Sequence, residues 1–318
     1  MGKLVFLFPG QGSQYVGMGK ELAESYAVAR AVLAEADEAL GFPLSRLCLA
    51  GPEEELRLTA NTQPAVLTVS VAAARVLEEK GVRPDYVAGH SLGEYSALVV
   101  SGCLALQEAV VTVKRRGQYM QEAVPAGAGA MAAILGLPQA QVEEVCRRTA
   151  QDQVVALANL NSPAQIVISG HAEAVNRAVE AAKGAGAKRA ILLPVSAPFH
   201  CALLRPAARH LERDLFKVEF EELKVPLVTN VDAEIVAAPE AARDALMRQV
   251  CAPVRWEESM RRLIGLGCDR FIEVGPGKVL RGLLRQIDRG VACTNVEDQE
   301  SLDATLTKLA ATKSEATP

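Results

Sequence analysis

The chain has 318 residues, half of them hydrophobic, so a sizeable core can be buried, and its net charge of −4 lacks the basic excess typical of nucleic-acid-binding proteins. Aromatic residues make up only 4%, which also argues against stacking on bases. The seven cysteines form no CxxC pair, and no apolar stretch approaches the roughly 20 residues of a membrane span. We therefore expect a cytoplasmic protein with no metal site, no nucleic-acid partner and no membrane segment.

Strand-like and helix-like segments alternate at both ends of the chain, which predicts a parallel sheet with helices on both faces. The tail from residue 310 is small and polar, so we expect it to be disordered. The predicted strands lie at 3–8, 86–89 and 270–274, and the long predicted helices lie at 19–40, 62–80 and 106–123.

The middle of the chain follows a different order. After a predicted hinge at Ala126-Gly127-Ala128-Gly129, the pattern reads strand, helix, strand, strand, helix, strand. This βαββαβ order is typical of a ferredoxin-like unit. We place this inserted subdomain at 126–196, within a large α/β domain formed by 1–125 and 197–318.

A glycine-rich loop, Pro9-Gly10-Gln11-Gly12, follows the first predicted strand. Such loops often bind phosphate, but Tyr15 stands where the dinucleotide motif needs its third glycine. Glu21 follows Gly19-Lys20, where a P-loop needs Ser or Thr. The loop therefore fits neither nucleotide motif, although it lies where ligands bind in parallel sheets.

The strongest chemical signal is Gly89-His90-Ser91-Leu92-Gly93, a GxSxG pattern between a strand-like and a helix-like segment. In a nucleophile elbow this pattern places a serine on a tight turn, with its Oγ exposed and with glycines where side chains would clash. We therefore predict that Ser91 is a nucleophile.

A serine nucleophile needs a base, and the chain has four histidines. His90 lies within the elbow, His171 begins a helix and His210 lies mid-helix, so each favours a structural or solvated position. His200 lies in a loop at the domain junction, where clefts form, and is the predicted base. The chain has no obvious triad Asp, so a backbone carbonyl or a side-chain amide is expected to orient the imidazole.

Seven stretches in chain order resemble the malonyl-CoA:acyl-carrier-protein transacylase family, which includes the acyltransferase domains of fatty-acid and polyketide synthases. The resemblance covers nearly the whole chain and implies a hydrolase-like large domain with the ferredoxin-like insertion. It implies ping-pong transfer of malonyl from malonyl-CoA to the phosphopantetheine thiol of acyl carrier protein, with no cofactor. The stretches are FPGQGSQ, GHSLGEYSA, KRRGQYMQEA, NLNSPAQIVISG, SAPFHCALLRPAA, LMRQVCAPVRW and FIEVGPGKVL.

The resemblance also assigns roles to residues. Ser91 would carry the acyl group, His200 would be the general acid and base, and the backbone carbonyl of Gln249, at the acyl pocket, would orient the imidazole. Backbone N–H groups of Gln11 and Leu92 would form the oxyanion hole.

Arg116 lies in a Lys114-Arg115-Arg116 run, and such a run by itself predicts a solvated face. The resemblance instead assigns Arg116 to the malonyl carboxylate. A planar guanidinium suits that task because it can donate two charge-assisted hydrogen bonds to one carboxylate.

Four further positions bear on the acyl pocket. By resemblance, Leu92 and Phe199 form the malonyl-selecting pattern, because a bulky Phe narrows the space where a branch methyl would lie. Asn159 and Asn161 either line the pocket or belong to a turn between two strands.

The acidic carrier proteins of this pathway imply a basic docking patch. Lys278, Arg281, Arg285 and Arg289 recur at helical spacing, and Lys188 with Arg189 lies near the end of the inserted unit. Each set is either a docking surface or an ordinary solvated face. The alternative functions are a GxSxG thioesterase or acyl hydrolase and a non-enzymatic scaffold, and Arg116 favours the transferase. We expect a monomer.

Overall fold

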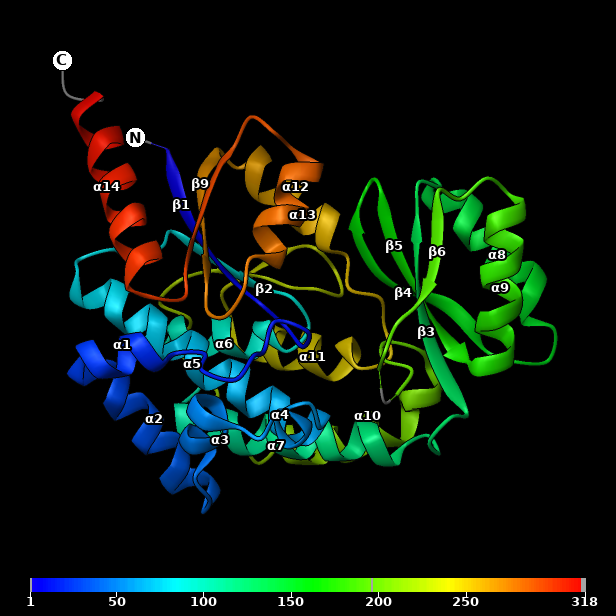
Figure 1. The fold of residues 1–318 in the computed structure, drawn as a ribbon, viewed down its shortest axis with the longest axis horizontal. Helices are drawn as coiled ribbons and strands as arrows, with labels where there is room; N and C mark the ends of the chain where they lie inside the picture. The colour runs from blue at the N-terminus through cyan, green and yellow to red at the C-terminus, as the bar shows by residue number, and fades with distance from the viewer. Residues whose placement is uncertain (1, 196, 316–318) are drawn as a thin grey trace.

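A six-stranded sheet forms the centre of the larger of two units in the computed structural model, which describes residues 2–195 and 197–315 (Figure 1). The smaller unit, built on a four-stranded sheet, lies at one side of it. The elements in chain order are β1 (Lys3–Phe8), α1 (Lys20–Ser25), α2 (Ala27–Leu40), α3 (Leu44–Ala50), α4 (Glu53–Leu56), α5 (Thr59–Glu79), β2 (Tyr86–Gly89), α6 (Gly93–Val100), α7 (Leu106–Glu122), β3 (Gly129–Leu135), α8 (Gln139–Ala150), β4 (Val155–Ser162), β5 (Gln165–His171), α9 (Ala172–Gly184), β6 (Arg189–Leu192), the 3₁₀ turn η1 (Ala202–Leu204), α10 (Arg205–Leu215), β7 (Leu227–Val228), β8 (Ile235–Val236), α11 (Pro239–Gln249), α12 (Trp256–Gly265), β9 (Cys268–Val274), α13 (Val279–Ile287), β10 (Ala292–Val296) and α14 (Gln299–Glu315).

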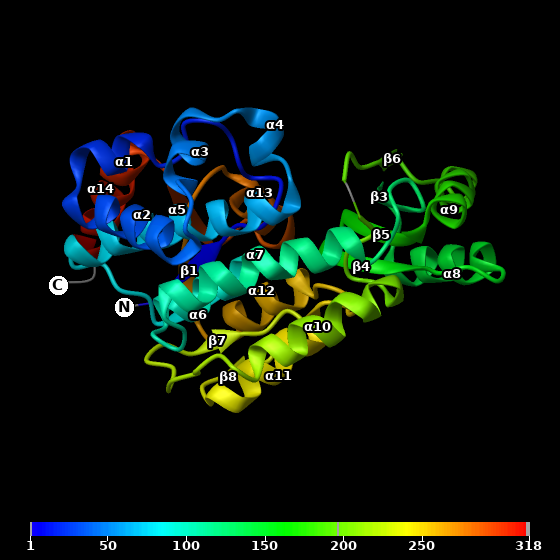
Figure 2. The same cartoon turned by 90° about the horizontal axis from the view of Figure 1, so that it is seen from below.

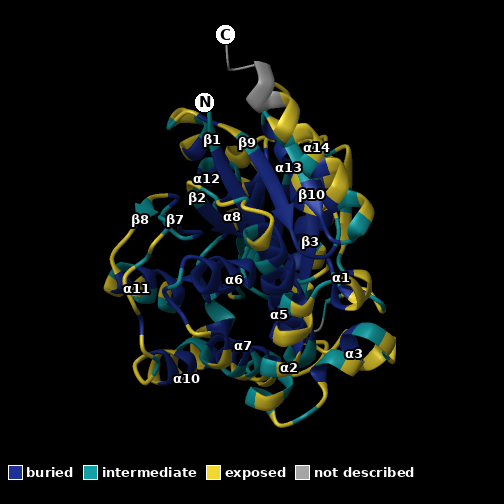
Figure 3. Cartoon of the chain, turned by 90° about the vertical axis from the view of Figure 1, so that its left-hand side faces the viewer, coloured by how far each residue is buried: buried dark blue, intermediate teal, exposed yellow. Residues whose placement is uncertain are grey.

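The large sheet has the order β10-β9-β1-β2-β7-β8 and is parallel except for β8. Its central strand β1 is buried from Leu4 to Phe8, as expected for a strand covered on both faces. Phe6 and Phe8 pack in the cluster that contains α5 and α6, whereas Val5 and Leu7 pack with α12 and α13. Figure 3 shows β1, β9 and α6 buried at the centre. The predicted parallel sheet with helices on both faces is confirmed.

The small unit has the strand order β4-β5-β3-β6, and all its neighbouring strands are antiparallel. Helices α8 and α9 cover one face and supply most of its apolar cluster. This arrangement confirms the predicted ferredoxin-like class. The sheet runs from Gly129 to Leu192, and we propose the domain limits 126 and 196 around it, although residue 196 lies outside the described part.

The opposite face of the small sheet is turned toward the large unit. Met131 and Ala133 on this face pack with Phe199, which follows the last strand. Strand β4 is also joined to the large unit by backbone hydrogen bonds, from Leu160 N–H to Val254 O (2.8 Å) and from Val254 N–H to Ala158 O (2.9 Å). The small sheet therefore forms a wall over the carboxyl ends of β1 and β2. Figure 2 shows α7 and α10 side by side in the large unit, with one end of each near the small unit.

Two predicted segments are wrong in extent. The helix predicted over 19–40 is interrupted at Tyr26, whose extended backbone (φ −122°) separates α1 from α2. The tail predicted to be disordered from residue 310 is helical as far as Glu315 in α14, and residues 316–318 lie outside the described part.

Candidate active site

Ser91 lies at the turn between β2 and α6, on left-handed backbone with φ 52°. Glycine is needed at the two flanking positions for steric reasons. A Cβ on Gly89 would lie 1.9 Å from the carbonyl carbon of Gly93, and a Cβ on Gly93 would lie 2.0 Å from the carbonyl oxygen of Phe8. Backbone atoms cannot yield by that amount, so the turn has the geometry of a nucleophile elbow.

The Ser91 hydroxyl contacts an imidazole. Its Oγ lies 2.8 Å from His200 Nε2, and His200 Nδ1 donates to the backbone oxygen of Gln249 at 2.9 Å. Burial, together with the positive charge of Arg116, lowers the pKa of His200 to about 3. The imidazole is therefore neutral at physiological pH, with Nε2 free to accept the serine proton.

The other histidines have different partners. His90 Nε2 lies 2.8 Å from Asn161 Oδ1, and its ring lies beside Trp256. His171 Nδ1 accepts from the Val154 N–H at 2.9 Å, and the His210 ring stacks on Tyr119.

Gln11 and Leu92 line the same cavity as Ser91. The hydrogen bonds between described residues include no acceptor for the backbone N–H of either residue, so both donors are free for a ligand. Gly10 lies close to the backbone of the elbow, since a Cβ on Gly10 would lie 2.5 Å from the His90 carbonyl oxygen. The glycine thus lets the first loop pack against the elbow.

Arg116 is buried in α7, with 2% exposure, whereas its neighbour Arg115 is exposed and pairs with Asp214 at 3.5 Å. The solvated-face interpretation is therefore wrong for Arg116. Helix α7 lies so close to α5 that a Cβ on Gly117 would lie 2.7 Å from the Thr59 carbonyl oxygen. This close packing of the two helices buries the neighbouring Arg116.

The Arg116 guanidinium points at the nucleophile. Nη2 donates to Ser91 Oγ at 3.2 Å and to Gln249 Oε1 at 2.9 Å, and Nη1 donates to Gln63 Oε1 at 2.7 Å. No carboxylate within the described chain forms a direct ion pair with it, so an incoming carboxylate would find a buried cation whose polar contacts are all neutral groups.

The cavity above Ser91 has a volume of about 130 Å³. Phe199 and Asn159 line it together with Met131, so the small unit forms one of its walls. Asn161 lines an adjoining cavity of about 210 Å³ instead, between the Gly10–Ser13 loop and α13. The predicted turn at Asn161 is wrong, because β4 continues to Ser162.

The predicted docking residues lie on the surface. Lys278 pairs with Glu297 at 3.2 Å, and Arg281 Nη1 donates to Asn295 Oδ1 at 3.1 Å. Arg285 is exposed on α13, but Lys278 precedes the helix and Arg289 lies beyond its end, so the predicted four-residue helical stripe is wrong at both ends. Lys188 and Arg189 are exposed at the start of β6.

Three buried polar residues of the site were not predicted from the sequence: Gln63, the acceptor from Arg116 Nη1, together with Asn230 and Glu94. Asn230 Oδ1 accepts from the Ser91 N–H and Asn230 Nδ2 donates to the Gly89 oxygen, both at 2.6 Å. Glu94, fully buried in α6, accepts from Gln249 Nε2 at 2.7 Å. Asn230 carries no sequence signal, whereas Glu94 could have been noticed as a charged residue in the elbow's otherwise apolar helix.

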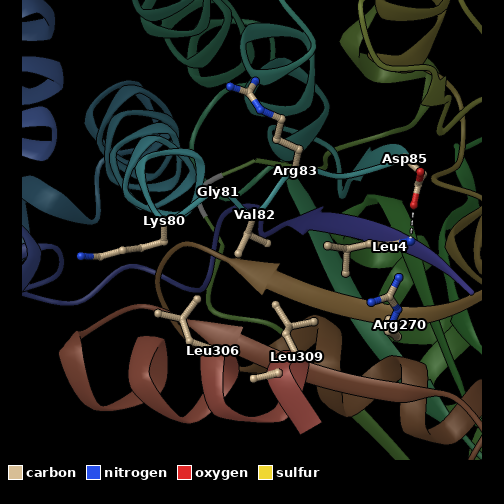
Figure 4. Close-up of a pocket in the computed structure, with 10 residues that line it drawn as sticks. Leu4, Lys80, Gly81, Val82, Arg83, Asp85, Arg270, Leu306 and Leu309 are labelled. Atoms are coloured by element: carbon tan, nitrogen blue, oxygen red, sulfur yellow. Dashed lines mark hydrogen bonds between the residues drawn. The ribbon is translucent and has the colours of Figure 1, made fainter. Parts of the chain in front are cut away.

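A larger cavity of about 330 Å³ lies at the opposite end of the strands of the large sheet, between the end of α5 and α14 (Figure 4). Figure 4 shows the side chain of Val82 facing those of Leu306 and Leu309, which project side by side from α14. None of its described lining residues is a Ser, Cys or His, and it opens at the amino ends of the strands. Ligands of parallel sheets bind at the carboxyl ends, so the cavity at Ser91 is the candidate active site.

No helix in the described residues is long and apolar enough to cross a membrane, and these residues include no His, Cys, Asp and Glu grouping suited to a metal. All seven cysteines are free.

Comparison with known proteins gives one consistent result. The acyl transferase domain family matches residues 5–305. The chain is 49% identical over 310 residues to the malonyl CoA-acyl carrier protein transacylase of Bacillus subtilis (strain 168), covering 97% of this chain and 98% of that protein.

Solved structures agree with this match. A crystal structure of an acyl carrier protein S-malonyltransferase from Vibrio cholerae has a TM-score of 0.93 and 48% identity, covering 95% of this chain and 99% of that one. A type II PKS acyl-carrier protein in complex with its malonyl-transacylase gives a TM-score of 0.94 and 47% identity, covering 96% and 99%.

Proposed function

The chain belongs to the acyl transferase domain family, and on that premise we propose that it transfers malonyl from malonyl-CoA to the phosphopantetheine thiol of acyl carrier protein. The transfer is ping-pong and supplies extender units for fatty-acid or polyketide synthesis. Malonyl-CoA is a substrate, and the proposed steps use no further cofactor. The observation that carries the proposal is a buried Arg116 within hydrogen-bond distance of a serine that contacts a neutral imidazole.

In the first half-reaction, His200 Nε2 takes the Ser91 proton while Oγ attacks the thioester carbon. The N–H groups of Gln11 and Leu92 donate to the oxyanion of the tetrahedral intermediate. The C–S bond then breaks, the proton passes from His200 to the CoA sulfur, and malonyl-Ser91 remains. The bond from Nδ1 to the Gln249 carbonyl holds the imidazole in the tautomer that these steps need.

In the second half-reaction, the carrier-protein thiol gives its proton to His200 and attacks malonyl-Ser91. The ester C–O bond breaks, and the proton returns to Ser91. The same base and oxyanion hole serve both steps, which is why one site suffices for two substrates.

Selectivity for malonyl rests on Arg116, which supplies donors to the distal carboxylate. Phe199, with Leu92 beside the nucleophile, limits space near the α-carbon, and excluding one methyl is worth about 1–3 kcal/mol. The GxSxG acyl hydrolase remains the alternative, but a hydrolase of neutral esters has no use for a buried cation at this position.

Incubation with malonyl-CoA labelled in the malonyl group tests the proposal. We expect one malonyl on the Ser91 peptide by mass spectrometry, discharged when carrier protein is added. Free malonate formed without carrier protein would support the hydrolase, and the absence of label would support a scaffold. Ser91→Ala is the control for non-enzymatic labelling.

For docking of the acidic carrier protein, we propose two sets of exposed basic residues: Arg281 and Arg285 on α13, with Lys278, and Lys188 with Arg189 on the small unit. Charge reversal of Arg281 and Arg285 to Glu should raise the carrier-protein KM at low salt and leave the malonyl-CoA KM unchanged. An unchanged carrier-protein KM would exclude α13. Arg83→Glu, at the remote cavity of Figure 4, is the matched control.

A cytoplasmic location also stays a prediction, supported by seven free thiols, since oxidising compartments favour disulfides.

A further inference from the structure

Glu94 is a fully buried carboxyl group that does not line the cavity at Ser91. Its Oε2 accepts from Gln249 Nε2 at 2.7 Å and from the Asn230 N–H at 3.1 Å. Its Oε1 has no hydrogen-bond partner among the described residues. A buried carboxylate is costly unless it is paired, so its presence beside the site requires an explanation.

Gln249 connects this carboxyl group to both functional side chains. Its backbone oxygen accepts from His200, its Oε1 accepts from Arg116 Nη2, and its Nε2 donates to Glu94 and to the Ser91 carbonyl oxygen. An ionised carboxylate can only accept and a guanidinium can only donate. Glu94 and Arg116 therefore impose the same orientation on the Gln249 amide, with its nitrogen toward Glu94 and its oxygen toward Arg116.

Glu94 is also the counter-charge of Arg116 in the absence of substrate. The charged and titratable groups that act on it are Arg116 from α7, Asp232 from the loop after β7, and Tyr95 on its own helix. Burial raises the pKa of Glu94 to about 7, against the lowering effects of the hydrogen bonds from Gln249 and Asn230 and of the Arg116 charge.

We propose that Glu94 is a positioning residue of the malonyl site, which orients the Gln249 amide toward Arg116 and takes up a proton when a substrate carboxylate binds that arginine. The inference rests on the proposed malonyl transfer. The physical reason is charge balance, because a second carboxylate on Arg116 brings a like charge near Glu94 and favours its neutral form.

The sign of the pH effect follows from linkage. If the substrate carboxylate raises the pKa of Glu94, binding is favoured where Glu94 can be protonated and weakens as pH rises above about 7, the value in the free protein. For a rise of about one-half to one pKa unit, kcat/KM for malonyl should fall about three- to tenfold between pH 6 and pH 9. An acetyl thioester has no carboxylate, so its kcat/KM should not show this fall.

The experiment measures the rate of Ser91 acylation by malonyl-pantetheine and acetyl-pantetheine, which lack the titrating phosphate groups of CoA, across pH 6–9. We expect the malonyl fall in the wild type and its loss in Glu94→Gln, which keeps an acceptor oxygen but cannot ionise. Glu94→Ala should lower malonyl kcat/KM at least about tenfold more than acetyl kcat/KM, and the Gln variant should recover most of that loss.

Glu273→Gln is the matched control. Glu273 is also fully buried, burial raises its pKa to about 7, and it accepts backbone N–H groups at the start of α13. This variant should keep the malonyl pH dependence. A malonyl profile that is flat in the wild type, or a fall that persists in Glu94→Gln, would overturn the inference.

If the Glu94 variants do not fold, the wild type still tests the proton uptake, because a malonyl profile as flat as the acetyl profile would overturn it. The proposed function fails separately, when no malonyl appears on Ser91 at pH 7.

Discussion

Replacing Asn230 with Ala removes two side-chain hydrogen bonds that hold the backbone around Ser91. The Asn230 amide bonds the Ser91 N–H and the Gly89 carbonyl at 2.6 Å each, and the residue is fully buried. Ser91 has left-handed backbone, which a non-glycine residue adopts only when its surroundings hold it there. The substitution leaves both backbone groups in the interior without their partner.

The magnitude follows from those two groups. A buried polar group left without a hydrogen bond costs about 1–3 kcal/mol, so two such groups predict a loss of about 2–6 kcal/mol in the free energy of unfolding. A slower rate of Ser91 acylation should accompany the loss, because relaxation of the turn moves Oγ away from its 2.8 Å contact with His200.

Urea unfolding followed by tryptophan fluorescence measures the stability change, since Trp256 is the single tryptophan, is fully buried and lies beside His90. Asn176→Ala, at an exposed position in α9, is the control and should change stability by less than about 0.5 kcal/mol. An Asn230→Ala variant as stable and as rapidly acylated as the wild type would refute the claim that the Asn230 side chain holds the Ser91 turn.

Three further predictions concern the elbow, the cation and the base. Gly93→Ala should lower the free energy of unfolding by at least about 2 kcal/mol, because the new Cβ would lie 2.0 Å from a carbonyl oxygen of β1. Gly282→Ala, with open space around the new Cβ, is the control and should be neutral or stabilising. Equal effects of the two substitutions would contradict the steric argument. Arg116→Ala should lower malonyl kcat/KM at least about tenfold more than acetyl kcat/KM. The exposed control Arg115→Ala should lower neither. Equal losses of malonyl and acetyl transfer in Arg116→Ala would show that Arg116 does not bind the malonyl carboxylate. Because the pKa of His200 is lowered to about 3, the rate of Ser91 acylation by an acetyl thioester should stay level from pH 8 to pH 5. A fall of about 30-fold in this rate, as for an ordinary histidine, would show that the imidazole is not desolvated in solution.

The fold class could be predicted because its signals are local. Buried apolar runs separated by helical patterns indicate a parallel sheet, and the βαββαβ order of the middle segment indicates its own unit. The break at Tyr26 and the helical tail could not be predicted in the same way. In each, the local sequence pattern pointed to the other outcome.

The candidate site divides along the same line. The elbow at Ser91 could be predicted because five consecutive residues carry its steric requirement. His200 could be predicted from its loop at the domain junction, whereas the role of Arg116 came from the resemblance. No local pattern separates Arg116 from Arg115, since neighbouring residues on a helix point in different directions and only the packing of α7 on α5 decides which is buried.

The sequence by itself therefore determined the nucleophile, the family and the alternation of strands and helices, because these depend on contacts within a few residues. Only the tertiary structure decided the polar network beneath the nucleophile. Asn230 and Gln249 lie 139 and 158 residues from Ser91 along the chain, yet both bond its backbone. The physical reason is that a buried polar group must find a partner wherever the fold provides one, and that partner need not be near in sequence.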